Sequence, residues 1–109
     1  MRGTLTELMP SLDGAQLAGD AAFDGVSTDS RSAQAGSLFV ALRGESFDAH
    51  DFLDQVAARG VAAVLVERLP AGWGSARVPA IVVADTLVAL GRIAHRSRRR
   101  FNLPVIAVT

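Results

Sequence analysis

The sequence has 109 residues, half of them apolar and a fifth charged, which is enough apolar material for one folded domain of ordinary size. All eleven basic residues are arginine and cysteine is absent, so the chain offers no lysine for a Schiff base or a phosphate loop and no thiol for catalysis. Eleven acidic residues balance the arginines, and this zero net charge argues against a domain that binds nucleic acid by bulk electrostatics.

The first part of the chain predicts a short helix followed by short strands. Thr4 and Glu7 have the spacing of a capping box and precede apolar residues at helical intervals, but Pro10 should keep this helix short or broken. Between residues 14 and 25, three glycines separate small apolar and polar residues, a pattern typical of short strands joined by tight turns. We place a further strand near residues 26–28.

The middle of the chain predicts a strand, a helix and a second strand. The apolar run 38–42 is too short for a helix, so we expect a strand buried on both faces. Asp48 is a plausible N-cap of a helix that Gly60 ends, and the run 61–67 returns as a strand. A helical crossover of this length joins parallel strands. The sequence therefore predicts an α/β fold, with a small parallel or mixed sheet and flanking helices.

The last third of the chain predicts a loop, a strand and a longer helix. Residues 69–79 contain the prolines and glycines of a loop, and residues 80–84 form another apolar strand. Asp85 caps a predicted helix over 85–101, whose arginine-rich end suits the helix dipole. The apolar run 105–109 predicts a strand. Because such a strand normally feeds a further element that covers it, we expect the chain to be part of a longer protein. The start lacks a signal-peptide core, and no run of eighteen apolar residues occurs, so we expect a soluble cytoplasmic protein that does not bind membranes.

Polar side chains follow two of the predicted strands at the end where α/β proteins bind their ligands. Thr28, Ser30 and Arg31 offer hydroxyl and guanidinium groups that suit a pyrophosphate. Ser46 adds another hydroxyl, and Phe47 offers an aromatic face to a base. These residue types favour a nucleotide-binding pocket.

The same segment also has a purely structural interpretation, which the sequence leaves open. In it the hydroxyls satisfy turn backbone, Asp29 pairs with Arg31, and Phe47 lies in the core. His50 is interpreted as a structural or ligand-orienting residue, because no nucleophile is spaced beside it. His95 lies among arginines on the last helix, and the two histidines are too few and too separated to predict a zinc site.

The stretch VSTDSRSAQAGSLFVALRGESFDAHDF, residues 26–52, resembles the N-terminal domain of the Mur ligases. LTELMPSLDGAQLAGD at the start, VAAVLVE, DTLVALGRIA and the closing VIAVT resemble successive pieces of the same family, so the likeness covers essentially the whole chain. GESFDAH favours the branch that adds D-alanyl-D-alanine. The sister branch, which adds the third amino acid, usually has a GHxxDG-type segment there and is the alternative.

The resemblance implies a three-domain, ATP-dependent ligase of peptidoglycan precursor synthesis in the cytoplasm. Its first domain would bind the uridine diphosphate end of UDP-N-acetylmuramoyl-tripeptide, its second ATP with Mg²⁺, and its third the D-alanyl-D-alanine. Residues 1–84 would be the substrate-binding domain, and residues 85–109 would begin the ATP-binding domain, just ahead of a GxxGKT loop. We therefore expect this chain to position substrate without any cofactor of its own and without ligase or ATPase turnover.

By the same resemblance, two motifs supply the substrate contacts. Thr28 and Ser30 match positions that contact the uridine and phosphates, while the segment after Gly44 lines the same pocket. The expected substrate-binding residues are Thr28, Ser30, Arg31, Glu45, Ser46, Phe47, Asp48 and His50; no catalytic or metal-binding residue is expected. Two other functions remain: a protein-interaction module that ignores UDP, and a nucleic-acid binder that uses the arginines of residues 96–100. For that arginine run we favour a solvated helix end.

Overall fold

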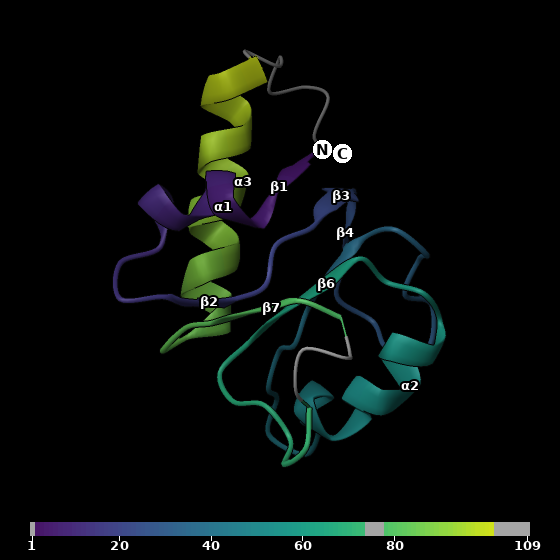
Figure 1. Cartoon of the computed structure of the whole chain (residues 1–109). Helices are drawn as coiled ribbons and strands as arrows, with labels where there is room; N and C mark the ends of the chain where they lie inside the picture. Colours follow the sequence, from purple (N-terminus) through teal and green to yellow (C-terminus); the bar gives the residue numbers. More distant parts are fainter. Residues whose placement is uncertain (1, 74–77, 102–109) are drawn as a thin grey trace.

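The structure, a computed structural model, describes residues 2–73 and 78–101 and contains a five-stranded and a two-stranded sheet there (Figure 1). The larger sheet has the order β2-β7-β6-β5-β4. Its strands are β2 (Gln16–Ala18), β4 (Val26–Ser27), β5 (Leu38–Val40), β6 (Ala63–Val66) and β7 (Ala80–Val82). β4, β5, β6 and β7 run parallel, and β2 pairs antiparallel with β7. The predicted α/β fold with a small mixed sheet is confirmed.

The smaller sheet and the helices complete the described part of the chain. β1 (Arg2–Thr4), which the sequence did not predict, pairs antiparallel with β3 (Ala22–Asp24). The helical elements are α1 (Leu5–Leu8), the 3-10 turns η1 (Met9–Ser11) and η2 (Ala49–Phe52), α2 (Leu53–Ala58) and α3 (Thr86–Phe101). The capping box at the start of α1 and the short, broken helix around Pro10 are confirmed. The strand predicted over 105–109 lies outside the described residues.

The helix predicted after Asp48 is correct in place but not in form. Asp48 caps it as expected, since its side chain accepts from the His50 N–H. The first four residues form a 3-10 turn, and the α-helix begins only at Leu53, after Phe52, whose φ of −116° and ψ of 17° are not α-helical. The expectation of one continuous α-helix is therefore wrong for this first turn. Gly60, with a positive φ of 88°, ends the segment in the left-handed region that glycine adopts without strain.

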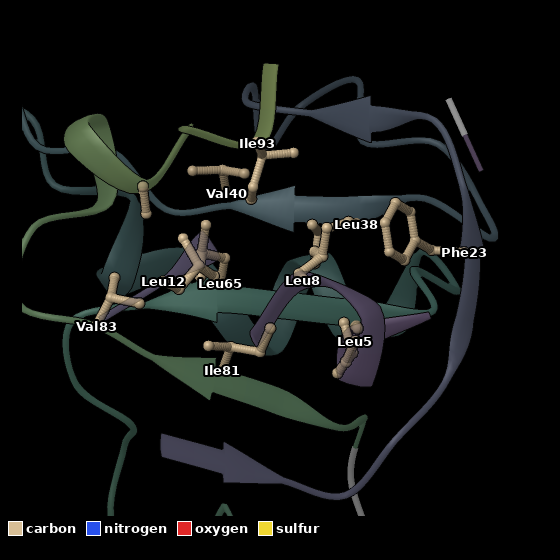
Figure 2. Packing of buried hydrophobic residues seen from close by; sticks show 12 residues of the cluster. Leu5, Leu8, Leu12, Phe23, Leu38, Val40, Leu65, Ile81, Val83 and Ile93 are labelled. Atoms are coloured by element: carbon tan, nitrogen blue, oxygen red, sulfur yellow. The ribbon is translucent and has the colours of Figure 1, made fainter. Parts of the chain in front are cut away.

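The parallel strands β5, β6 and β7 are buried on both faces because their apolar residues alternate between two core clusters, whereas β4 is half-buried. The first cluster includes Leu38, Val40, Leu65 and Ile81 from the strands, Leu5, Leu8 and Leu12 from α1 and the turn after it, and Ile93 from α3 (Figure 2). The second includes Phe39, Val64, Val66 and Ala80 from the strands, Leu53 and Val56 from α2, and Trp73. α1 and α3 thus cover one face of the sheet, and α2 covers the other. None of the helices in the described part of the chain has the length and apolar character needed to cross a membrane.

The first turn of α3 is tied to the carboxyl end of the sheet by a buried threonine. The Thr86 hydroxyl donates to the Ala41 carbonyl at 2.7 Å, and the Thr86 N–H donates to Glu67 Oε2 at 3.0 Å. Glu67 Oε1 also pairs with Arg43 Nε at 2.7 Å. Burial raises the pKa of the Glu67 carboxyl, but the hydrogen bonds from Thr86 and Arg43 outweigh it, so the net shift is downward. As predicted, Asp85 caps this helix by accepting from the next turn.

A second set of hydrogen bonds holds the segment between β5 and α2 against the end of β6. His50 is buried, and its Nε2 accepts the Glu67 N–H at 2.8 Å. Because that nitrogen must be unprotonated, the ring proton lies on Nδ1 and is donated to Asp48 Oδ1 at 2.7 Å. Arg68 donates to the other oxygen of Asp48 at 2.9 Å. Burial raises the pKa of the Asp48 carboxyl, yet the hydrogen bonds from Arg68 and His50 hold it well below its ordinary value.

The buried Thr86 hydroxyl should contribute measurably to stability. Thr86→Val keeps the shape and leaves the Ala41 carbonyl without its donor, so we expect the free energy of unfolding to fall by about 1–3 kcal/mol. Thr6→Val is a matched control, because that exposed hydroxyl donates to Asp20 at the surface and its loss should cost below about 1 kcal/mol. Urea unfolding followed by circular dichroism measures the free energy of unfolding of both variants. Equal losses in the two would contradict a stabilising role for the hydrogen bond from Thr86 to Ala41.

The lowered pKa of Asp48 makes its contribution dependent on pH. A carboxyl with a depressed native pKa stabilises the fold above its unfolded pKa of 3.8 and loses this effect as pH falls toward the native value. Asp48→Asn, which keeps a capping residue, should therefore cost about 1–2 kcal/mol at pH 7 and progressively less below pH 4. Thermal unfolding of the variant, the original chain and the exposed control Asp51→Asn across this range measures the difference. A cost that does not change with pH would rule out the ionic contribution.

Candidate ligand-binding site

A cavity of about 480 Å³ lies at the carboxyl ends of β4 and β5, and we call it the strand-end cavity. One wall comes from the turn that follows β4, and the other from η2, α2 and the turn that precedes them. The lining residues are Thr28, Asp29, Ser30, Arg31, Phe47, Phe52 and Gln55. The position matches the edge at which parallel α/β sheets bind ligands, because the carboxyl ends of the strands meet there.

Two stacked aromatic rings form one wall of the strand-end cavity. The ring centroids of Phe47 and Phe52 lie 5.4 Å apart, and their planes are inclined by 13°. Phe47 is 49% exposed, so the interpretation of this side chain as a core residue is wrong. The stack leaves the ring of Phe47 accessible while Phe52 supports it. A flat aromatic ligand can stack on the accessible ring of Phe47 in this wall.

The opposite wall is polar and carries one guanidinium group. Asp29 Oδ1 accepts the Arg31 N–H at 2.9 Å, and the Arg31 Nε lies 3.3 Å from the same oxygen. This backbone hydrogen bond is the main cause of the lowered pKa of Asp29, so the Asp29–Arg31 pairing of the structural interpretation is present. The two side chains are 85% and 48% exposed, and so exposed an ion pair contributes little. The guanidinium is free to turn toward an anion in the cavity.

Ser30 lies deeper in the same wall. The residue is 3% exposed and lines the cavity. In the described part of the chain, every fully buried side-chain nitrogen or oxygen has a hydrogen-bond partner. No hydrogen bond of the Ser30 hydroxyl is found among those same residues, so this hydroxyl must reach the cavity surface, where it can bind a ligand oxygen.

The eight residues expected from the sequence do not all meet in one place. Four of them, Thr28, Ser30, Arg31 and Phe47, line the strand-end cavity. Glu45 and Ser46 are exposed in the turn beside it and do not line it. The other two expected residues, Asp48 and His50, make the hydrogen bonds to the residues that follow β6, and they also lie outside the cavity lining.

Three lining residues were not among those expected from the sequence. Asp29 was assigned only a pairing role, and neither Phe52 nor Gln55 was assigned a role in the site. Phe52 and Gln55 are three positions apart and therefore share one face of the helical segment, which is the signal that could have found them. Among the described residues, no group of three or more histidine, aspartate or glutamate side chains is placed to hold a metal ion.

The sequence comparisons assign a family. The family described as "Mur ligase family, catalytic domain" matches residues 22–98. The chain is 45% identical over 93 residues to the UDP-N-acetylmuramoyl-tripeptide--D-alanyl-D-alanine ligase of Synechocystis, and 42% identical over 106 residues to that of Escherichia coli. These alignments cover 85% and 97% of this chain but only 20% and 23% of the relatives. The chain thus spans about a fifth of the length of the curated relatives that it matches.

Solved structures give the same result for the fold. The chain superposes on MurF from Acinetobacter baumannii with a TM-score of 0.75 and 35% identity, over 92% of this chain and 22% of that one. MurF from Thermotoga maritima, solved in complex with ADP, gives a TM-score of 0.61 and 28% identity over 70% of this chain and 17% of that one. The family match, the identities and the shared fold agree, and the chain belongs to the Mur ligase family, with the fold of a MurF-type N-terminal domain.

Proposed function

We propose that this chain binds the uridine diphosphate end of UDP-N-acetylmuramoyl-tripeptide, as the substrate-binding part of a ligase that adds D-alanyl-D-alanine. The observation that carries the proposal is the convergence of Arg31, Ser30 and the Phe47 ring in one cavity. The names of the relatives supply the substrate. Diaminopimelate-adding ligases of Aquifex aeolicus and Cytophaga hutchinsonii are 40% identical over 87 residues and 44% identical over 66 residues. These alignments are shorter than the 93 and 106 residues aligned with the D-alanyl-D-alanine ligases of Synechocystis and Escherichia coli, which favours the latter.

The chemistry of the two walls suits the two parts of a nucleotide. The diphosphate carries negative charge that a guanidinium binds through charge-assisted hydrogen bonds, and Arg31 is the cationic residue in the lining. Asp29 is the carboxylate beside it, and its charge is engaged by the Arg31 N–H and side chain. The uracil ring would stack on Phe47, where an aromatic contact adds to the area buried.

The remaining steps of a ligase would need parts of the protein outside these 109 residues. We infer that ATP, with Mg²⁺, is bound by such a part, as the ADP complex of a MurF structure supports for the nucleotide. The boundary near residue 84 is part of this proposal, as is a cytoplasmic location. On this account the chain positions the substrate, because binding energy at the uridine diphosphate, far from the reacting group, helps to orient that group. The chain does not itself hydrolyse ATP.

Arg31→Ala should weaken the binding of UDP by about tenfold, because one charge-assisted hydrogen bond to phosphate is lost. The same substitution should leave the binding of uridine, which has no phosphate, unchanged. Isothermal titration calorimetry with both ligands measures the two effects. Arg92→Ala, an exposed arginine on α3 that pairs with Asp13, is the matched control and should change neither affinity.

Two outcomes would contradict the proposed function. The first is an original chain that binds neither UDP nor uridine at millimolar concentration. The second is an Arg31→Ala variant that binds UDP as tightly as the original chain does. A loss that is equal for UDP and uridine would remove the assignment of Arg31 to the phosphates.

A further inference from the structure

Glu67, which directly follows β6, holds three segments of the chain at the carboxyl end of the sheet. Its backbone N–H donates to Nε2 of His50 in η2 at 2.8 Å. Its carboxylate divides between two partners: Oε1 pairs with Nε of Arg43 at 2.7 Å, and Oε2 accepts the N–H and the hydroxyl of Thr86 at 3.0 and 3.2 Å. The Glu67 side chain is only 14% exposed, so water competes weakly for these contacts. One residue therefore joins the segment after β5 to the first turn of α3.

The turn that carries Phe47 is attached to Glu67 at both of its ends, and we call residues 43–48 the Phe47 turn. The backbones of Arg43 and Asp48 pair as an isolated antiparallel bridge, and the Phe47 carbonyl accepts a backbone N–H within the turn at 2.6 Å. At the first end, the Arg43 guanidinium meets the Glu67 carboxylate. At the second end, the Asp48 carboxylate binds the buried histidine of η2, whose other ring nitrogen accepts the Glu67 N–H. A displacement of the turn therefore acts on Glu67.

The Phe47 turn and α3 are attached to different parts of the apolar core. Leu53, in the helix that follows the turn, belongs to the cluster that α2 covers, whereas Ile93 of α3 belongs to the cluster on the other face. The sheet lies between these two clusters. Among the described residues, the hydrogen bonds and the ion pair of Glu67 reach both the turn and the helix. Glu67 thus offers a polar connection between two segments that pack on opposite faces.

We propose that Glu67 is a positioning residue that couples ligand binding in the strand-end cavity to the position of the first turn of α3. The inference rests on the proposed function, because UDP is the ligand that would stack on Phe47 and displace the Phe47 turn. With the domain boundary proposed near residue 84, α3 begins the ATP-binding part of the protein. Glu67 then links the occupancy of the substrate cavity to the part that binds ATP.

The geometry of the carboxylate transmits the displacement. Phe47 is half exposed and lines the cavity, so a ligand that stacks on its ring shifts the turn to which Arg43 belongs. Because a carboxylate is planar and rigid, a movement of Glu67 Oε1 with Arg43 also moves Oε2 relative to the Thr86 N–H. Such a chain of hydrogen bonds is a physical route for coupling, and the coupling is reciprocal, so a change at Thr86 acts on the Phe47 turn as well.

The test uses amide chemical shifts of the ¹⁵N-labelled chain at saturating UDP, so that changes of affinity do not affect the comparison. UDP should shift the signals of residues 47–55 and, by a smaller amount, the signal of Thr86. Glu67→Gln keeps an acceptor for the Thr86 N–H but loses the charge that binds Arg43, and it should reduce the Thr86 shift by at least half. Asp51→Asn, the matched control, removes an exposed carboxylate from η2 and should leave both shifts in place.

A second variant guards against a loss of folding in Glu67→Gln. Arg43→Met breaks the same ion pair from the side of the turn, and the Arg43 side chain is 54% exposed, so this change leaves the core intact. It should reduce the UDP-induced shift of Thr86 to the same extent. If UDP shifts residues 47–55 but not Thr86, or if these variants leave the Thr86 shift unchanged, the coupling is overturned.

A ligand-free measurement keeps the outcome distinct from that of the proposed function. Thr86→Val should shift the amide signal of Gly44 in the Phe47 turn, whereas Thr86→Ser, which keeps the hydroxyl, should not. Arg92→Ala, which removes an exposed ion pair from the same helix, is the control and should leave Gly44 unchanged. If UDP does not bind but Thr86→Val shifts Gly44, the proposed function fails and the coupling stands. If UDP does not bind and Gly44 is unchanged in Thr86→Val, both are overturned.

Discussion

The structure depends on one constraint, which is that three of the four parallel strands, β5, β6 and β7, must be covered on both faces. The alternation of large apolar residues along β5, β6 and β7 meets this constraint with two clusters, one under α1 and α3 and one under α2. Because every connection between these strands has to return over a face, all four carboxyl ends meet at one edge. The strand-end cavity lies there as a consequence of the packing.

The polar residues at that edge divide into those that hold the fold and those that line the strand-end cavity. Glu67 lies at the centre of the first group, since its backbone binds His50 and its carboxylate binds Arg43 and Thr86. These contacts fix the segment that carries Phe47 and the first turn of α3 against the same strand end. The second group, which includes Ser30 and Arg31, is left with accessible polar atoms. This division explains why His50, which was expected among the substrate-binding residues, is buried and does not line the cavity.

Local patterns in the sequence predicted most of the elements, because the interactions that form them are local. The Thr4–Glu7 capping box and the apolar run at 38–42 act over a few residues, and both are found in the structure. The sequence favoured a structural or ligand-orienting role for His50, but its partner could not be predicted, because its Nε2 binds the N–H of Glu67, just after the next strand. The sequence left open whether Phe47 is accessible or lies in the core, since this depends on how η2 places Phe52 against the ring. Long-range contacts decide both cases.

The central claim is that the carboxyl ends of β4 and β5 bind a uridine diphosphate. A titration of the ¹⁵N-labelled chain with UDP, followed by its amide chemical shifts, tests this claim most directly. The account predicts saturable shifts concentrated in residues 28–31 and 47–55, with little change along β2 or α1. Shifts confined to α3, or no saturable shift at all, would contradict it.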